Sequence, residues 1–337
     1  MSVSTYQEAS ASESDATAIR RFSNLALSTL ISTILLIMVG SIVRVTGNGL
    51  GCPDWPLCHG RAIPPFYLSA WVEFLHRLFG AAVVVQAAVL IYLSWRWFKP
   101  DKWIYRTAVF TSVILTIQVI LGGIHVVYEL PRWTGWIHTG VAMLVAGAVA
   151  IWVAVSRPET RQLGARTAKL LQGTRLPTWT IIAAGASYIL ILTGSLVTRT
   201  GASLVCPDFP ACGLETVPDN LQTIVLIQMA HRIAAFVVAF AIILTLWYLL
   251  RASNRDRGIR TVAWTLIALL ALQFGLGMSN VLLALPMWSR ILHLGTAATI
   301  WVFLVILSVT LARGQNQEIA LSESAAVPTS ATASEVD

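Results

Sequence analysis

Eight long apolar blocks restrict this chain to a small set of folds. A helix needs roughly 20 apolar residues to cross the hydrocarbon core of a bilayer. Inside lipid every backbone polar group must also find its partner within the protein. The blocks are continuously apolar, whereas the strands of a membrane barrel alternate. We therefore predict an all-α integral membrane protein with eight transmembrane helices, at about residues 23–43, 71–95, 106–127, 133–156, 178–198, 223–250, 261–283 and 288–312.

The basic residues predict how these helices are oriented. With both termini on one side, sixteen Lys and Arg residues gather on that side, and Arg77 and Arg232 lie inside helices. The positive-inside rule then places both termini in the cytoplasm of a prokaryotic plasma membrane and the cysteine loops outside the cell. The net charge of +7 is thus a topology signal and does not indicate nucleic-acid binding. The opposite side receives five arginines: Arg44, Arg61, Arg132, Arg199 and Arg290.

Each half of the chain carries a copy of the same sequence pattern. The segment "GSIVRVTGNGLGC" (40–52) matches "GSLVTRTGASLVC" (194–206), and "EFLHRLFGAAV" (73–83) matches "QMAHRIAAFVV" (228–238). Four helices per half is an even number, so both halves enter the membrane from the same side, as in a parallel repeat. We expect two four-helix bundles (20–156 and 178–313), a basic cytoplasmic linker (157–177) and two disordered cytoplasmic tails (1–19 and 314–337).

The four cysteines of the chain lie in two loops with the pattern C-P-D-aromatic-P-x-C. The predicted topology places these loops in a compartment that permits disulfides. Pairing Cys52 with Cys58 and Cys206 with Cys212 is the simplest of three connectivities. Free or metal-binding thiols are the alternative.

Four of the six histidines occupy matched positions in the two halves. His231 and His293 follow His76 and His138 by 155 positions each, near the outer ends of their helices. One histidine on each of two facing helices is what a bis-imidazole haem iron requires. A hydrogen-bonded packing role is the alternative, and a closed zinc site would need four ligands rather than two.

The two halves differ three residues before the first histidine of each pair. Glu73 precedes His76, whereas Gln228 precedes His231. Positions i and i+3 share a helix face, and an ionisable group inside a membrane span indicates a functional site. The alternative is that Glu73 simply pairs with Arg77. The asymmetry suggests chemistry in the first half and an electron-carrying haem in the second.

The remaining polar residues carry weaker signals. Arg77 and Arg232 follow the first histidine of each pair and could bind haem propionates through their guanidinium forks; snorkelling toward the interface competes with this role. His59 is expected to be solvated in its loop. His125, whose counterpart is Asn280, is expected to be a polar packing residue.

These motifs resemble the haem A synthase family, membrane enzymes that complete haem A for terminal oxidases. The resemblance is carried by "TGNGLGCPDWPLCHG", "EFLHRLFG", "WIHTG", "QMAHR" and "LHLG", and covers the chain from the first helix to the eighth. It implies that the C8 methyl group of haem O is oxidised in successive steps to a formyl group, with water implicated as the source of oxygen.

Carried over to this chain, the resemblance assigns a role to each matched residue. His76 and His138 would hold the substrate haem O, His231 and His293 a resident haem B, and Glu73 would be the essential carboxylate. Haem O synthase and an electron acceptor are the implied partners in the bilayer, and a homo-oligomer is left open. Two other hypotheses about the function remain. A non-enzymatic di-haem electron carrier of the b type would use the same histidines, and a transporter would explain the repeat.

Overall fold

The computed structural model describes residues 3–210, 212, 221–252 and 256–326. Within these residues the chain forms nine α-helices and one short 3₁₀ helix, and no strand. Eight of the helices are long and apolar enough to cross a membrane, so the prediction of an all-α protein with eight spans is confirmed. In chain order the elements are α1 (Val3–Val45), α2 (Leu68–Trp97), α3 (Lys102–Val127), α4 (Arg132–Ser156), α5 (Pro158–Leu170), α6 (Leu176–Thr200), η1 (Ala202–Leu204), α7 (Gln222–Ala252), α8 (Arg257–Leu282) and α9 (Met287–Ala326).

The ends of several helices follow from local chemistry. The carboxylate of Asp101 accepts the backbone N–H groups of Trp103 and Ile104 and caps α3. Asp256 caps α8 in the same way through the N–H of Ile259. At the other end of a helix, Gly201 adopts a left-handed conformation with φ 79° and ends α6.

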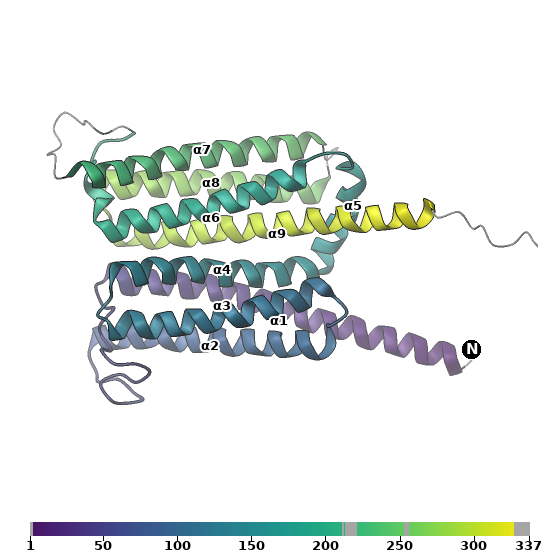
Figure 1. Ribbon diagram of the computed structural model, residues 1–337, viewed down its shortest axis with the longest axis horizontal. Coiled ribbons are helices and arrows are strands. Elements are labelled where there is room, and N and C mark those ends of the chain that lie inside the picture. Colours follow the sequence, from purple (N-terminus) through teal and green to yellow (C-terminus); the bar gives the residue numbers. More distant parts are fainter. Residues whose placement is uncertain (1–2, 211, 213–220, 253–255, 327–337) are drawn as a thin grey trace, which may run out of the picture.

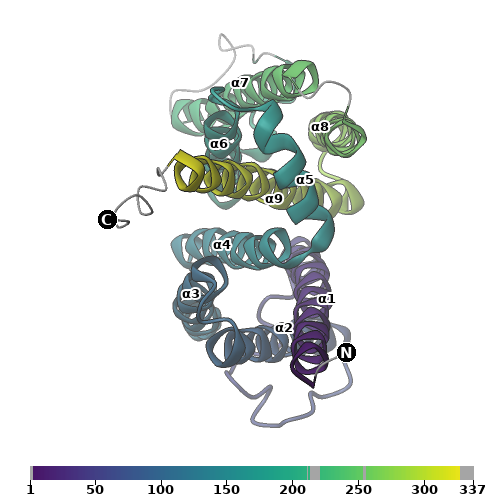
Figure 2. The same ribbon diagram turned by 90° about the vertical axis from the view of Figure 1, so that its right-hand side faces the viewer.

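The spanning helices lie side by side in two groups of four. Figure 2 shows α1–α4 around one axis and α6–α9 around another, with α4 and α9 adjacent between them. Figure 1 shows that the loops following α1 and α6 lie at one end of the molecule. The N-terminal end of α1, the C-terminal end of α9 and the short helix α5 lie at the opposite end. The relation of the two groups by a parallel repeat stays a prediction.

The seam between α4 and α9 is held by small residues and indole hydrogen bonds. Trp301 on α9 donates from Nε1 to the carbonyl of Met143 on α4 at 3.0 Å, and its ring lies against Gly147. Trp136 on α4 donates in the same way to Leu192 on α6 at 3.0 Å. Small residues allow membrane helices to approach closely, and the indole N–H needs a partner inside lipid. The two groups therefore share one packed interior.

The predicted disordered tails are corrected for the residues that the structure describes. Helix α1 begins at Val3, so residues 3–19 are helical, and α9 continues beyond Arg313 to Ala326. Neither segment contains proline, and adding residues to an existing helix costs far less free energy than starting one. Residues 327–337 of the predicted C-terminal tail lie outside the described part.

The predicted linker contains a helix that the sequence analysis missed. In α5, Pro158 occupies the first turn, where its missing N–H is not needed. Leu163, Gly164, Thr167 and Ala168 are buried on one face, and α5 packs against α9. Arg166 forms an ion pair with Asp256 at 3.8 Å. The linker is therefore docked on the second group of helices.

Glycine at position 164 is required by the close approach of α5 and α9. A Cβ atom there would lie 2.7 Å from the carbonyl oxygen of Thr310. We expect Gly164→Ala to lower the free energy of unfolding by about 1–3 kcal/mol relative to a matched control, because the backbones must separate. Gly185→Ala is the control, since a Cβ on that helical glycine meets nothing within 4 Å. Thermal unfolding in detergent measures both, and equal midpoints would contradict the packing argument.

Candidate functional site

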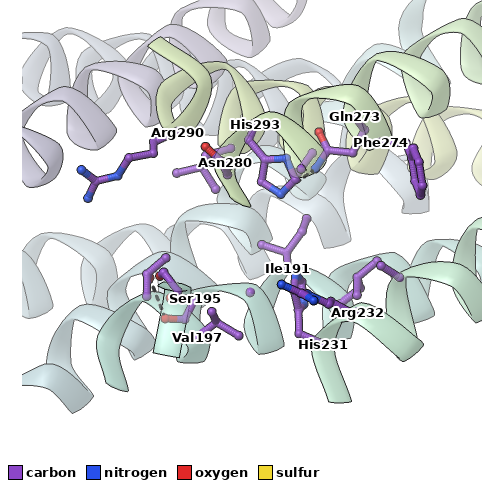
Figure 3. Close-up of a pocket in the computed structure, with 18 of the residues that line it drawn as sticks. Ile191, Ser195, Val197, His231, Arg232, Gln273, Phe274, Asn280, Arg290 and His293 are labelled. Atoms are coloured by element: carbon purple, nitrogen blue, oxygen red, sulfur yellow. Dashed lines mark hydrogen bonds between the residues drawn. The ribbon is translucent and has the colours of Figure 1, made fainter. Parts of the chain in front are cut away.

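The four repeat-matched histidines lie on four different helices. His76 is on α2, His138 on α4, His231 on α7 and His293 on α9. All four are half-buried. His231 and His293 project from opposite walls of a cavity of about 280 Å³, whose wall also includes Ile191 and Phe274 (Figure 3). The second group of helices therefore encloses an apolar cavity with an imidazole on each side.

Each of the four imidazole rings lies close to a glycine of a neighbouring helix. These glycines are on α1, α3, α6 and α8, and they are matched between the halves just as the histidines are. A side chain at three of them would press on the ring, and at Gly122 it would make an ordinary van der Waals contact. The distances from a built Cβ to the imidazole Cε1 are 3.0 Å for Gly40 and His76, 3.5 Å for Gly122 and His138, 2.9 Å for Gly194 and His231, and 3.2 Å for Gly277 and His293.

Two glutamines complete the pattern and were not predicted from the sequence. The amide nitrogen of Gln118 lies 3.2 Å from Nε2 of His138, and that of Gln273 lies 3.3 Å from Nε2 of His293. With the amide donating, Nε2 is the unprotonated nitrogen. The same lone pair would bind a metal, so each amide must give up this contact when its histidine binds an iron. The available signal was the repeat, since Gln273 follows Gln118 by the same 155 positions as the histidines.

The two halves differ at the position before each first histidine. Glu73 is buried and forms an ion pair with Arg77 at 3.1 Å, as the alternative interpretation of this residue expected. Gln228 is equally buried, accepts the N–H of Cys206 at 2.9 Å and donates to the carbonyl of Ser203 at 2.9 Å. The neutral residue thus ties its loop to α7, whereas the first half keeps an ionisable group at this point.

The imidazoles also have different neighbours in the two halves. Nδ1 of His231 is 2.8 Å from the hydroxyl of Thr193, and the aligned residue in the first half is Val39. Nδ1 of His76 is buried, with no hydrogen-bond partner among the described residues. The expectation that His125 is a polar packing residue agrees with its 2.7 Å contact to Thr134. Its ring also lies parallel to that of His138, with centroids 6.3 Å apart.

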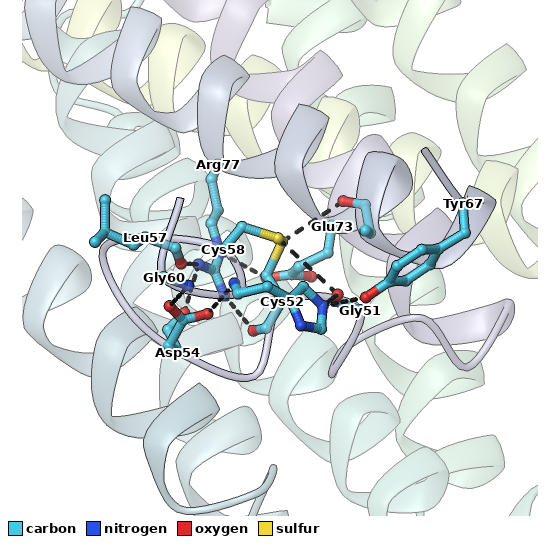
Figure 4. The surroundings of a disulfide bond; sticks show 11 residues. Gly51, Cys52, Asp54, Leu57, Cys58, Gly60, Tyr67, Glu73 and Arg77 are labelled. Atoms are coloured by element: carbon cyan, nitrogen blue, oxygen red, sulfur yellow. Dashed lines mark hydrogen bonds and ion pairs between the residues drawn. A yellow bond between two sulfur atoms is a disulfide. The ribbon is translucent and has the colours of Figure 1, made fainter. Parts of the chain in front are cut away.

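Both cysteine loops are closed by a disulfide and held by an arginine of the helix that follows the loop. The structure joins Cys52 to Cys58 and Cys206 to Cys212. Arg77 donates to the carbonyls of Cys52, Asp54 and Leu57 at 2.7–2.8 Å (Figure 4).

Arg232 does the same for the carbonyls of Cys206, Asp208 and Pro210. That Arg77 and Arg232 bind haem propionates stays a prediction. Both arginines direct their donors to loop carbonyls, and they act as loop anchors.

The first loop is further ordered by Asp54 and His59. The carboxylate of Asp54 accepts the backbone N–H groups of Gly60 at 2.7 Å and His59 at 2.5 Å. The hydrogen bond from Gly60, followed by that from His59, holds the pKa of Asp54 below its usual value. His59 is exposed as expected, but Nε2 contacts the carbonyl of Gly51 and the hydroxyl of Tyr67. The loop has a defined conformation beside Glu73.

Comparison with known proteins gives a consistent result. A family model described as a cytochrome oxidase assembly protein (COX15-CtaA) matches residues 23–72 and 66–305. The chain is 30% identical over 217 residues to a protein named heme A synthase from Bacillus cereus strain AH187, covering 64% of this chain and 68% of the relative. It is 28% identical over 276 residues to a heme A synthase from Lysinibacillus sphaericus strain C3-41, covering 80% and 88%.

The anchoring of the first loop can be tested with Arg77→Lys. A lysine cannot reach three carbonyls at once, so buried acceptors lose their partners, and we expect a loss of about 1–3 kcal/mol in stability. The Cys52–Cys58 bond should also be reduced faster by a water-soluble reductant. Arg61→Lys is the control, because Arg61 is exposed on the same loop. If the two variants had equal melting temperatures and equal reduction rates, Arg77 would not be an anchor.

Proposed function

The chain belongs to the COX15-CtaA family of cytochrome oxidase assembly proteins, and on this basis we propose that it is a multi-pass membrane oxidoreductase that converts haem O into haem A. The observation that carries the proposal at the level of residues is the combination of two matched histidine pairs with a single buried carboxylate at one of them. A non-enzymatic di-haem carrier would use the same histidines, but it gives Glu73 no role and is not favoured by the family.

The second pair, His231 and His293, is suited to hold a resident haem B. The two imidazoles face each other across an apolar cavity, and a haem iron needs one nitrogen from each side. Thr193 fixes the orientation of one ring by its contact to Nδ1, which leaves Nε2 for the metal. When bound there, haem B supplies a carrier that takes up one electron at a time. Gln228 adds no charge beside it.

The first pair, His76 and His138, is suited to hold the substrate haem O. The rings are placed by Gly40 and Gly122 in the same way as in the second pair. Nδ1 of His76 lacks the hydroxyl partner that His231 has among the described residues. An iron-binding histidine with fewer fixed hydrogen bonds suits a substrate haem, which must enter and leave the site.

Glu73 is proposed as the carboxylate that acts on the reacting methyl group. Oxidation of a methyl carbon on a conjugated macrocycle removes electrons and leaves that carbon electron-poor. A nearby carboxylate can stabilise the positive charge, or take a proton from the water that supplies oxygen. Arg77 holds the carboxylate in place at 3.1 Å, and the adjoining Cys52–Cys58 loop covers this end of α2 (Figure 4).

The cellular setting is also part of the proposal. The distribution of basic residues supports cytoplasmic termini and cysteine loops on the outer side of a prokaryotic plasma membrane. Haem O is delivered within the bilayer, so haem O synthase is the expected donor. The electrons removed from the substrate require a separate acceptor.

The identity of the bound haems tests the proposed function directly. The full chain, expressed together with a haem O synthase, should yield haem B together with haem O, haem A or a hydroxylated intermediate when its haems are extracted and weighed by mass spectrometry. Haem B alone in both sites would overturn the enzyme and support the electron carrier.

Glu73→Gln tests the carboxylate with almost no change in shape. We expect haem to remain bound and the fold to remain intact, while the yield of haem A falls at least a hundredfold and haem O or an early intermediate accumulates, because an amide cannot take a proton. If Glu73 serves only as the partner of Arg77, the variant would lose about 0–1 kcal/mol of stability and still make haem A. Gln228→Glu changes the matched position in the other half and serves as the control, in which haem O should not accumulate as it does in Glu73→Gln.

Gly194→Ala tests whether ring placement controls the resident haem. Its Cβ would lie 2.9 Å from Cε1 of His231, so the ring must turn away from the cavity. We expect less haem B per protein and a weaker low-spin signal, as in His231→Leu. Gly80→Ala is the control, because a Cβ there meets nothing within 4 Å. Normal haem content in Gly194→Ala would show that the glycine is not needed for ligation.

A further inference from the structure

Three arginines lie together where the two groups of helices meet. Arg44 is in the last turn of α1, Arg199 in the last turn of α6 and Arg290 in the first turn of α9. All three are half-buried and line the cavity that contains His231 and His293. Figure 3 shows Arg290 at one end of that cavity, one turn of α9 before His293. We refer to Arg44, Arg199 and Arg290 as the seam arginines.

The seam arginines carry positive charge without a compensating anion. Within the described part of the chain, none of the three belongs to an ion pair; the pairs found there involve Arg77, Arg157, Arg166 and Arg313. Arg199 donates from Nη2 to the carbonyl of Gly135 at 3.2 Å, while its Nε is buried without a partner in this part of the chain. Arg44 experiences the charges of both Arg290 and Arg199.

This arrangement is costly in the protein alone. Like charges repel more strongly where water is excluded, and buried charges in proteins are normally paired. Arg290 also stands at the N-terminal end of α9, where the helix dipole favours an anion over a cation. An arginine fork offers parallel N–H donors that match a carboxylate. An anion at this end of the cavity would compensate these charges.

The seam arginines also connect the two halves. Arg44 comes from the first group of helices but lines the cavity of the second. Arg199 comes from the second group but donates to Gly135 on α4, three residues before His138. Each half thus contributes an arginine to the site of the other.

We propose that the seam arginines receive the propionate carboxylates of the bound haems. Arg44 and Arg290 serve the haem between His231 and His293, and Arg199 reaches the haem between His76 and His138. The inference rests on the proposed function. A haem combines a flat apolar body with two carboxylates on one edge, which suits an apolar cavity that is cationic at one end. Arg77 and Arg232 already direct guanidinium donors to the loop carbonyls.

Haem B and its dimethyl ester, which lacks the two charges, distinguish this role from a structural one. The full-length protein, purified in detergent from haem-deficient cells, would be titrated with each compound. We follow the low-spin signal that His231→Leu abolishes. Wild-type protein should bind the free acid about ten- to hundredfold more tightly than the ester. In Arg44→Gln and Arg290→Gln this preference should shrink toward onefold. Arg132→Gln, an exposed arginine on the same face, should behave as wild type.

Further outcomes each decide part of the inference. Arg199→Gln should weaken the haem held by His76 and His138 more than the haem that gives the His231 signal, although Arg199 also lines the second cavity. A larger effect on the His231 signal would contradict the assignment of Arg199 to the first haem. Equal affinity of wild-type protein for acid and ester would overturn the propionate assignment. This result, together with binding of phosphatidylglycerol that is lost in Arg44→Gln, would assign the arginines to a lipid phosphate.

The proposed function and the propionate assignment would be contradicted by different results. If no haem bound between His231 and His293 in the wild-type protein, the proposed function itself would fail. Arg44→Lys keeps the positive charge, so it should prefer haem B over the dimethyl ester more than Arg44→Gln does. If haem bound there and the two variants showed the same preference, only the charge-based inference would fail. The measurements require no turnover, so they do not depend on recovering the activity.

Discussion

Inside a bilayer an unpaired polar group costs several kcal/mol, because no water can replace the missing partner. The helices satisfy this constraint for the backbone. Buried hydroxyls satisfy it by bonding to the preceding turn, as Thr33 does with Thr29 and Ser94 with Leu90. Arg77 and Arg232 satisfy it by holding the loop carbonyls. Within the described residues, the buried polar atoms that lack a partner include Nδ1 of His76, His138 and His293 and Nε of Arg199.

The duplicated halves share one framework, to which the proposed function gives two tasks. In both, a glycine clears the space for each imidazole, and a glutamine lies at the second histidine. Three of the differences lie next to the histidines. Glu73 is replaced by Gln228, Val39 by Thr193, and His125 by Asn280. In the second half these changes remove a charge and add a fixed hydrogen bond, which suits a resident haem, while the first half retains the ionisable groups.

The sequence was sufficient to predict the features that depend on composition and repetition. All eight spans were located to within a few residues of their observed ends, apart from the longer first span, because apolar length decides whether a helix can cross the bilayer. The loop cysteines are joined locally, since six positions separate each pair. The helical tails and α5 were missed. Their polar composition gives no membrane signal, and their order depends on helix propagation and on contacts such as Gly164 with α9.

The finer parts of the site could not be predicted for a different reason. A glycine in a membrane helix has many uses, and only the packed structure shows that Gly194 faces His231. The sequence also does not show where an arginine side chain points. Arg77 is next to His76 in sequence, yet its guanidinium group donates to the carbonyl of Cys52 in the loop. In the aligned segments Arg44 stands opposite Thr198, and Arg199 opposite Val45. This shift of one position hides their common location from a comparison of the repeats.

The central position of α4 and α9 links the two proposed haem sites. Each of these helices carries the second histidine of its own half, and each packs against the other along the seam. His138 and His293 therefore stand on adjacent helices, while His76 and His231 lie on helices farther from the seam. Under the proposed function, electrons removed from the substrate would take their shortest route across this seam. Arg44 and Arg199, which each contact or line the other half, would then hold the propionates of both haems near this seam. Under the proposed function the duplication would provide two haem sites, and the packed seam would place them side by side.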